Sequence, residues 1–334
     1  MRIGFATGYD AAMGVREMAD RVRRAEERGY DIGFFSETNN VMRDGVSAIA
    51  AFGLATRRIT LGFTQIVRLR SPVVMAQTAA TLDELTGGRL VLCPGACTHS
   101  QAVTHGLDDL DPPRALVEWV DAIRLLLSGE RVSYAGEIVR LNGTRIGWTP
   151  ARRRVPIWIA AMSRTGLRLA ARIGDGVLLN AVSSPEYAAN AVAILKDAVR
   201  EAGRAWETFE VAEIVNCSVE DDHDAAVDAV RWEVASKFNP AKPSSQVGPR
   251  KRVGEPHIRE EDLPMLAEAY ERGGVEALIR AFPAAWIEGL TATGTPDEVV
   301  CRVQRYRDAG VTLPILRPAA RHQADRVIDL FAPR

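Results

Sequence analysis

Polar and titratable side chains follow the predicted strands of this 334-residue chain at the points where those strands end. Tyr9, Asp10, Glu37 and His99 are the members that could hold or deliver a proton. Other members can hydrogen-bond a ligand, and few are strong acids or bases. Together with the apolar neighbours Ile66, Ala96, Ala161 and Met162, the set comprises Tyr9, Asp10, Glu37, Thr38, Asn39, Asn40, Thr64, Gln65, Cys97, Thr98, His99, Ser163, Arg164, Asn180 and Arg317.

Each of these residues also has a plainer interpretation. A polar residue after a strand is often a turn residue or a helix cap. Asp10 and Glu37 could pair with nearby arginines, and His99 and His105 could be exposed histidines in an irregular loop. The sequence has no GxSxG elbow, HExxH helix or GxxxxGK[ST] loop, so it does not indicate the chemistries that those motifs carry.

The turn Met162–Gly166 offers a physical signal for anion binding. It precedes the helical pattern Leu167–Ile173, so it places backbone amides at the start of a helix, and Arg164 adds a positive charge. Free amides and the helix dipole both favour a negatively charged ligand. Every helix start has such amides, so the turn alone does not identify the ligand.

Strands and helices alternate along the chain and must position these residues. The clearest unit runs from the strand Ile59–Ile66, through a helix that opens at Pro72 and closes at Gly87-Gly88, to the strand Leu90–Cys93. A short apolar run after a capped helix is typical of a strand buried on both faces of a parallel sheet. The eight predicted strands are Ile3–Thr7, Ile32–Ser36, Ile59–Ile66, Leu90–Cys93, Pro156–Ala161, Gly176–Asn180, Phe209–Ser218 and Leu313–Leu316.

Helix signals separate these strands. Gly29 ends the first amphipathic helix, Asp44 caps the next, Pro113 and Pro185 open two more, and Thr295 begins a capping box. Eight strand–helix units in order favour an α/β fold of the (β/α)8 TIM-barrel type over a doubly wound sheet. Because active sites of such barrels lie at the carboxyl ends of the strands, we expect the polar set to surround one mouth.

Two insertions interrupt the predicted barrel. Arg131–Leu141 alternates around Ala135-Gly136 and predicts a hairpin before strand five. The segment Lys237–Pro256 is rich in proline, glycine and basic residues, which favours a lid or binding loop over a disordered linker. We therefore predict a single domain over residues 1–334, with an insertion or lid region at 237–293 inside it.

Composition limits the function classes. A net charge of −1 gives no electrostatic case for binding nucleic acid or an anionic membrane. No segment approaches the ~20 apolar residues that span a bilayer, and the chain opens directly on a strand, which argues against a signal peptide. The four cysteines are too few and too dispersed for a disulfide framework, and they complete no zinc site. We expect a cytoplasmic protein without a metal.

The order of elements resembles the bacterial luciferase-like superfamily of flavin- and deazaflavin-dependent oxidoreductases. The likeness spans about Met1–Asn180 and resumes over Gly294–Phe331. Its compact length is similar to the branch with methylene-tetrahydromethanopterin reductase and the deazaflavin-dependent glucose-phosphate dehydrogenase. The segments that carry it are AEERGYDIGFFSE at 25–37, RSP at 70–72, LDELTGGRL at 82–90, LSGE at 127–130, VPIWIAA at 155–161 and IGDG at 173–176.

This resemblance implies coenzyme F-420, a deazaflavin that carries only hydrides, and it implies roles for single residues. A non-proline cis peptide that supports the ring would fall near Thr64-Gln65, the phosphate-binding turn at Met162–Arg164, and a polar contact at Asn180. The residues assigned to cofactor binding are Thr64, Gln65, Ile66, Ala96, Cys97, Thr98, Ala161, Met162, Ser163, Arg164 and Asn180. Those assigned to the substrate are Tyr9, Asn40, His99 and Arg317.

Departures from the sugar-phosphate dehydrogenases indicate a different substrate. Glu37-Thr38 stands where those relatives have an Asp-His pair, and Gly95–Thr98 stands where they have a Gly-Thr-Gly-Glu turn. Ser183 stands where they use a lysine for the sugar phosphate. The resemblance therefore implies a small organic substrate that is not a sugar phosphate.

We predict hydride transfer between the deazaflavin and this substrate. Glu37, as an acid or as the group that orients the donor, leads the catalytic set, followed by Asp10 and Thr38. Arg68 and Arg70 would meet the anionic tail of the cofactor, and helices two and three would form a homodimer. Two alternatives stay open: an FMN-dependent monooxygenase that receives reduced flavin from a separate reductase, and a catalytically silent flavin-binding barrel.

Overall fold

The chain folds as a (β/α)8 barrel of parallel strands, as the sequence predicts. The structure is a computed structural model that describes residues 2–7, 12–37, 42–241, 255–258 and 260–332. All eight predicted strands are present: β1 (Gly4–Thr7), β2 (Ile32–Phe35), β3 (Thr60–Ile66), β4 (Leu90–Gly95), β7 (Trp158–Ala160), β8 (Gly176–Leu179), β9 (Glu210–Val219) and β11 (Leu313–Pro318).

The chain divides into two compact units. Gly4–Ala160 and Leu169–Leu178 form the amino-terminal unit; Met1–Ile3, Ala161–Arg168 and Leu179–Arg334 form the carboxyl-terminal unit. The predicted single domain over 1–334 stays a prediction.

Parallel strands that are apolar on both faces form the centre of the amino-terminal unit. The order of pairing is β1-β2-β3-β4-β7-β8, and every described residue of β1 and β2 is buried. Burial on both faces explains why these strands are continuous apolar runs. At Gly62 of β3, a Cβ would lie 2.7 Å from the ring of Phe34, so only glycine lets the two strands pack this closely.

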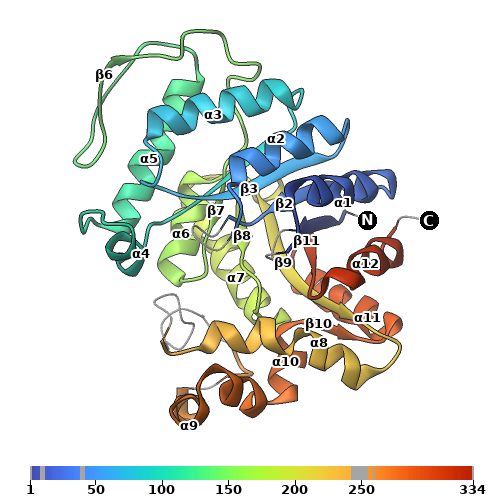
Figure 1. Ribbon diagram of the computed structural model, residues 1–334. Helices are drawn as coiled ribbons and strands as arrows, with labels where there is room; N and C mark the ends of the chain where they lie inside the picture. The colour runs from blue at the N-terminus through green and yellow to red at the C-terminus, as the bar shows by residue number, and fades with distance from the viewer. Residues whose placement is uncertain (1, 8–11, 38–41, 242–254, 259, 333–334) are drawn as a thin grey trace. The chain divides into compact units, whose positions relative to one another are not determined.

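The strands of this unit are joined by helices that, except for the first, begin at a side-chain cap. They are α1 (Val15–Glu27), α2 (Gly45–Ala55), α3 (Pro72–Leu85), α4 (His99–Thr104) and α5 (Pro112–Leu127), and α1, α2 and α3 pack side by side (Figure 1). Asp44 caps α2 by accepting a 2.8 Å hydrogen bond from the Ser47 amide, as predicted. After α3 the backbone turns through Gly87 and Gly88, whose φ angles of 66° and 80° favour glycine.

Helix α4 corrects the expectation of an irregular loop around His99. Thr98 and Gln101 form a reciprocal capping box at its start. Thr-x-x-Gln is a sequence signature of a helix start, so the residues held a signal that the sequence analysis did not use.

The predicted hairpin consists of β5 (Val132–Ala135) and β6 (Arg140–Thr144). It extends beside α5 (Figure 1). Glu118 of α5 fastens it by accepting hydrogen bonds from the backbone amides of Glu137, Ile138 and Val139.

The carboxyl-terminal unit contains three parallel strands in the order β10-β9-β11. Strand β10 (Ala292–Gly294) was not predicted, because three residues give no periodicity. Helix α6 (Arg164–Ile173) begins in this unit, followed by α7 (Pro185–Glu201), α8 (His223–Ala235), α9 (Leu263–Ala281), α10 (Ala284–Leu290), α11 (Pro296–Asp308) and α12 (Ala324–Leu330). Short 3-10 turns occupy Trp206–Thr208, Ser236–Phe238, Glu260–Asp262 and Arg321–Gln323.

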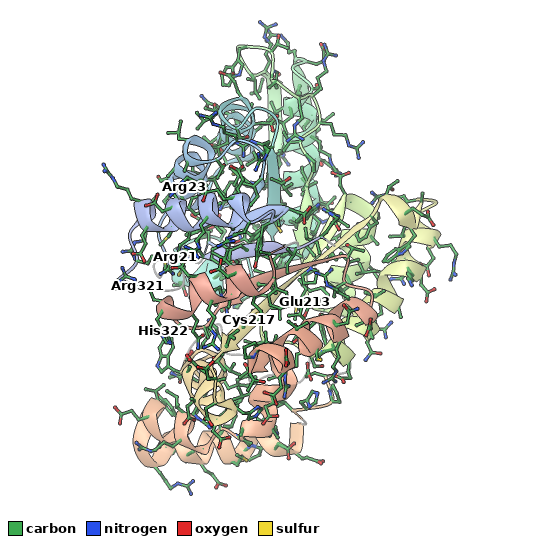
Figure 2. All side chains as sticks on the ribbon, turned by 90° about the vertical axis from the view of Figure 1, so that its right-hand side faces the viewer. Arg21, Arg23, Glu213, Cys217, Arg321 and His322 are labelled. Atoms are coloured by element: carbon green, nitrogen blue, oxygen red, sulfur yellow. The ribbon has the colours of Figure 1, made fainter. Side chains whose placement is uncertain are left out.

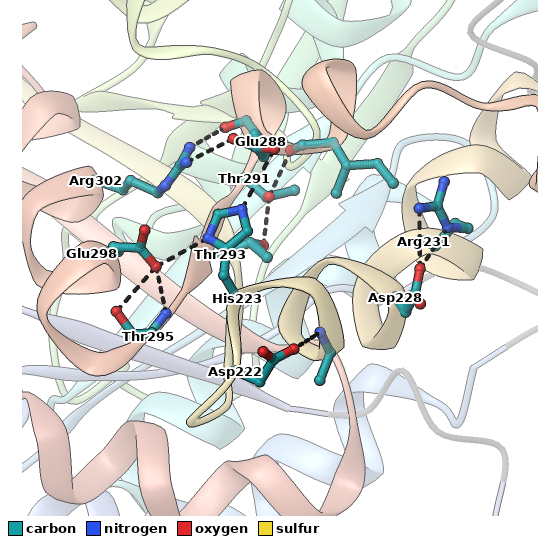
Figure 3. A network of polar contacts seen from close by, with 12 residues as sticks. Asp222, His223, Asp228, Arg231, Glu288, Thr291, Thr293, Thr295, Glu298 and Arg302 are labelled. Atoms are coloured by element: carbon teal, nitrogen blue, oxygen red, sulfur yellow. Dashed lines mark hydrogen bonds and ion pairs between the residues drawn. The ribbon is translucent and has the colours of Figure 1, made fainter.

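The predicted insertion region 237–293 holds α9, α10 and the first two residues of β10. Residues 242–254, the centre of the predicted lid segment, lie outside the described residues. A polar network joins α10 to α8 and α11 (Figure 3). His223 Nδ1 lies 3.0 Å from Glu298 Oε2, and its Nε2 lies 3.6 Å from Glu288 Oε1. Arg302 contacts the second oxygen of Glu288 at 3.1 Å.

No described helix combines the length and the apolar character needed to cross a bilayer.

Candidate active site

Glu37 follows β2 in the amino-terminal unit, where the sequence predicts a catalytic acid or orienter. It is buried, and both of its carboxylate oxygens have partners in the chain. Arg70 approaches Oε2 at 3.2 Å and Oε1 at 3.3 Å, and the Gly45 amide donates to Oε1 at 3.2 Å. A carboxyl group that delivers a proton must point one oxygen at the acceptor, so this geometry favours orientation over direct proton donation.

Arg70 is the centre of this polar cluster. Besides Glu37, its guanidinium contacts the side chains of Gln65 and Asp44, and its carbonyl oxygen accepts a 3.1 Å hydrogen bond from Trp119 Nε1. Burial raises the pKa of Asp44, but hydrogen bonds from Ser47 and the charge of Arg70 outweigh burial and hold this pKa below its usual value. These contacts favour a structural role for Arg70 over the expected role at the cofactor tail.

The ends of β2, β3 and β4 bring several predicted cofactor residues together. Thr64 Oγ1 donates to the Glu37 carbonyl oxygen at 3.3 Å, and Gln65 is held by Arg70. Ile66 aligns with Gly95 of β4 in an unbroken parallel register. All described peptide bonds are trans, so the cis bond that the resemblance implies near Thr64-Gln65 is not found.

Arg68 follows β3 with an uncommon backbone. Its φ of 77° lies in the left-handed region, which a non-glycine residue adopts at a cost of about 1–3 kcal/mol. Nη2 donates to the Asp108 carbonyl oxygen at 2.7 Å. Nη1 is buried and has no hydrogen-bond partner within the described part of the chain. Arg68 therefore keeps a donor that suits an anionic group.

The residues after β4 divide into buried and exposed members. Cys97 is buried; burial raises the pKa of its thiol, and the charge of Arg68 partly offsets this rise. Thr98 caps α4, and Ala96 is partly exposed. His99 is exposed and lies 2.7 Å from Asp109, which agrees with the plainer interpretation of a surface histidine.

In the carboxyl-terminal unit, Met162 and Asn180 meet after β7 and β8. The backbone amide nitrogen of Asn180 lies 3.1 Å from Met162 Sδ. The Tyr187 hydroxyl donates a 2.7 Å hydrogen bond to the Met162 carbonyl oxygen. Ser163 Oγ accepts a 3.1 Å hydrogen bond from the Gly166 amide at the start of α6. Helix α6 begins at Arg164, three residues earlier than predicted, so the predicted turn supplies the first amides of the helix. Ala161, Met162 and Ser163 are partly exposed, and Arg164 is exposed.

Arg317, a predicted substrate ligand, is 3% exposed. Its Nε donates to Asn216 Oδ1 and its Nη2 contacts Glu233 Oε1, both at 2.7 Å. The role of Arg317 toward a substrate stays a prediction, as do the roles of Tyr9, Asp10, Thr38 and Asn40, which lie outside the described residues.

Glu213 is a buried titratable group that the sequence analysis did not identify. Glu213 interrupts the apolar run of β9 and is fully buried beside Ser183. A single glutamate in a strand can also mark an exposed edge, so its isolation in the apolar run was the only signal available.

The comparison with known proteins covers nearly the whole chain. Residues 1–313 match the model of the luciferase-like monooxygenase family. The chain is 31% identical over 303 residues to the 5,10-methylenetetrahydromethanopterin reductase of Archaeoglobus fulgidus, covering 89% of this chain and 87% of the relative. It is 30% identical over 341 residues to a coenzyme F-420-dependent glucose-6-phosphate dehydrogenase of Nakamurella multipartita, covering 97% and 93%.

The fold is similar to a solved structure as well. The coenzyme F-420-dependent tetrahydromethanopterin reductase of Methanopyrus kandleri matches with a TM-score of 0.84 at 24% identity, over 99% of this chain and 98% of that chain.

Proposed function

The chain belongs to the luciferase-like monooxygenase family, and we propose that it is an oxidoreductase that transfers a hydride between coenzyme F-420 and a small organic molecule. The observation that carries the proposal is the similarity, over most of the chain, to enzymes that are named for this coenzyme or for a reductase activity of the same branch. The family resemblance predicted from the sequence is confirmed.

The residues at the start of α6 fit an anionic group of the cofactor. Ser163, Arg164 and the first amides of the helix offer hydrogen-bond donors and a positive charge. We propose that they hold a cofactor phosphate and that Asn180 contacts the cofactor beside Met162. In the amino-terminal unit taken by itself, Nη1 of Arg68 has no hydrogen-bond partner among the described residues, so it suits an anionic group. When bound, the deazaflavin supplies the hydride chemistry.

We propose a substrate other than a sugar phosphate. The family resemblance implies that Ser183 stands where the sugar-phosphate dehydrogenases use a lysine. Its hydroxyl lies within hydrogen-bond distance of Glu213 and of the Asn180 carbonyl oxygen. A hydroxyl with two partners inside the protein is a poor substitute for an ammonium group that binds phosphate.

The Arg70–Glu37 pair would orient the proton-handling group. A hydride that arrives at a carbonyl, imine or activated alkene leaves negative charge, which needs a proton within hydrogen-bond reach. Glu37 is fixed by Arg70 and Gly45, so its position is defined before any substrate binds. Fixed geometry of this kind is what general acid–base catalysis requires of an orienting residue.

A cytoplasmic homodimer is the proposed state of the protein. The four cysteines are all free, which agrees with a reducing compartment. Several apolar residues of α2 and α3 are buried inside the chain and are not available for dimerisation, among them Ile49, Phe52, Met75 and Ala79. Leu54 of α2 is 76% exposed, and Val74 and Leu85 of α3 are 48% and 42% exposed. These three side chains are the surface through which we propose dimerisation.

An FMN-dependent monooxygenase is the second candidate, favoured by the description of the family itself. Measuring oxygen consumption distinguishes this monooxygenase from the proposed hydride-transferring oxidoreductase. We expect the protein to leave oxygen consumption unchanged when it is mixed with reduced coenzyme F-420, and to give no more than the free-flavin rate with reduced FMN. Accelerated, substrate-dependent oxygen uptake with reduced FMN would overturn the proposal in favour of the monooxygenase. Binding of both cofactors without any turnover on a broad panel of carbonyl, imine and alkene compounds would favour the silent barrel.

A further inference from the structure

The side chains of Glu213 and Ser183 form a buried pair in the carboxyl-terminal unit. Glu213 lies inside this unit on β9, as Figure 2 shows, and Ser183 lies in the loop between β8 and α7. Ser183 Oγ lies 2.7 Å from Glu213 Oε1 and 2.8 Å from the Asn180 carbonyl oxygen. The hydroxyl is therefore placed between two oxygen atoms, each at hydrogen-bond distance.

The positions of these three oxygens determine where a proton is needed. A serine hydroxyl carries one hydrogen, and the carbonyl of Asn180 can only accept. An ionised Glu213 could also only accept, so two acceptors would compete for one hydrogen. If Glu213 carries a proton, it donates to Ser183 Oγ, and Ser183 donates to Asn180. Only the protonated carboxyl satisfies all three oxygens with well-directed hydrogen bonds.

The surroundings of Glu213 also favour the neutral form. No guanidinium or ammonium group contacts it within the part of the chain that the structure describes, and its Oε2 is buried without a hydrogen-bond partner there. An ionised carboxylate in such a place would be costly. Burial raises the pKa of Glu213 well above its usual value, the Ser183 hydroxyl lowers it, and the charge of Glu255 raises it further.

Other charged and titratable groups near this pair are already engaged. Glu255 accepts a 3.0 Å hydrogen bond from the Ser184 amide. Tyr306 of α11 donates its hydroxyl to the Ser183 carbonyl oxygen at 2.7 Å. Glu186 at the start of α7 is paired with Arg305 and His257. These contacts supply no proton to Glu213 Oε1.

The loop that the pair supports has a strained backbone. Val182, between Asn180 and Ser183, has a φ of 65°, which is a genuine outlier for a β-branched residue. Such a conformation persists only where surrounding contacts impose it, and it is found most often at functional sites. Two hydrogen bonds of Ser183 are contacts of this kind: its hydroxyl donates to the Asn180 carbonyl oxygen, and its carbonyl oxygen accepts from the Tyr306 hydroxyl.

We propose that Glu213 is a positioning residue that is held as the neutral carboxylic acid, and that its proton, through Ser183, fixes the loop that carries Asn180. The protonated state stands on the geometry alone, whereas the consequence for cofactor binding rests on the proposed function, in which Asn180 contacts coenzyme F-420.

Infrared spectroscopy tests the protonation state directly. The difference spectrum between the wild-type chain and Glu213→Gln at pH 7 should contain a carbonyl stretch of a buried carboxylic acid that shifts in heavy water. Glu210→Gln, at the start of the same strand where Arg2 pairs with the carboxylate at 2.6 Å, is the matched control and should lack this band. A carboxylate band in place of the acid band would overturn the proposal.

Cofactor titration tests the positioning role. Glu213→Gln keeps a donor toward Ser183, so its Kd for coenzyme F-420 should stay close to that of the wild type. Glu213→Leu removes one hydrogen bond and should raise the Kd roughly 3- to 10-fold, the scale of a single buried hydrogen bond. Ser183→Ala removes both hydrogen bonds of the hydroxyl and should raise the Kd at least as much. An unchanged Kd in both, or a Gln variant as weak as the Leu variant, would refute the positioning role. If the wild-type chain binds no deazaflavin, the proposed function fails while the infrared result still decides the protonation state.

Discussion

Arg70 contacts both carboxylate oxygens of Glu37, although the two residues are 33 positions apart in the chain and follow different strands. The same guanidinium also contacts Gln65 and Asp44, so one cation links the end of β2, the end of β3 and the start of α2. A residue expected at the catalytic centre is thereby built into the framework of the amino-terminal unit.

Removing the cation of this pair should destabilise the fold. Arg70→Ala leaves Glu37 buried without its charged partner, and breaking such a pair costs on the order of 3 kcal/mol. Glu37→Gln should cost less, because the amide can still accept from Gly45. Urea unfolding of both variants measures the difference. Equal stability of Arg70→Ala and the wild type would show that the pair is not structural.

Turnover tests the role of Glu37 in the reaction. Glu37→Gln keeps the shape of the side chain but removes the charge that pairs with Arg70, so turnover should fall at least ~100-fold while cofactor affinity changes little. The steady-state rate and the cofactor Kd are measured on the same preparation, with a substrate that supports turnover. Near-full turnover would make Glu37 purely structural.

The His223 network predicts a pH-dependent stability. The hydrogen bond to Glu298 raises the pKa of His223, burial lowers it, and the charges of Glu298 and Glu288 raise it further. Because the folded-state pKa lies above the unfolded value of ~6.5, the stabilisation is complete below that pH and is lost as pH rises through the folded-state pKa.

His223→Gln should therefore lose more stability relative to the wild type at pH 6 than at pH 9, two values chosen to lie on either side of the ordinary histidine pKa of ~6.5. Urea midpoints at the two pH values give this comparison. Asp228→Asn, on the exposed side of the same helix, is the control and should show no such trend. A His223→Gln variant with the same loss at both values would show that the histidine does not titrate against its carboxylates.

The apolar surface on α2 and α3 predicts a homodimer. Leu54→Lys places a charge in the proposed interface and should convert the protein to a monomer by light scattering at micromolar concentration. Trp232→Lys is the matched control, because Trp232 is also exposed, at 59%, but lies on α8 in the other unit. A monomeric wild-type chain would refute the interface, and so would a dimer that survives Leu54→Lys.

Local signals predicted most of the fold from the sequence. Continuous apolar runs marked the strands, and Asp44, Pro72, Pro185 and Thr295 marked helix starts that the structure confirms. Strand β10 and helix α4 were missed because three and six residues show little periodicity.

The candidate site was less predictable, because its determinants are distant in sequence. The partners of Glu37 and Glu213 depend on which loops the strands bring together, and a single sequence does not record those pairs. The spacing of the sequence indicated that Arg70 lies near the end of a strand, but it did not indicate that Arg70 forms ion pairs with Glu37 and Asp44.

Relative cofactor affinity tests the central claim most directly. We predict that fluorescence titration gives a micromolar or tighter Kd for coenzyme F-420 and a weaker one for FMN. Arg164→Gln should weaken the binding of coenzyme F-420, because it removes a charge beside the proposed phosphate-binding turn. Arg200→Gln, which changes an exposed arginine on α7, should leave this affinity unchanged. FMN that binds more tightly than coenzyme F-420 to the wild-type chain would contradict the account.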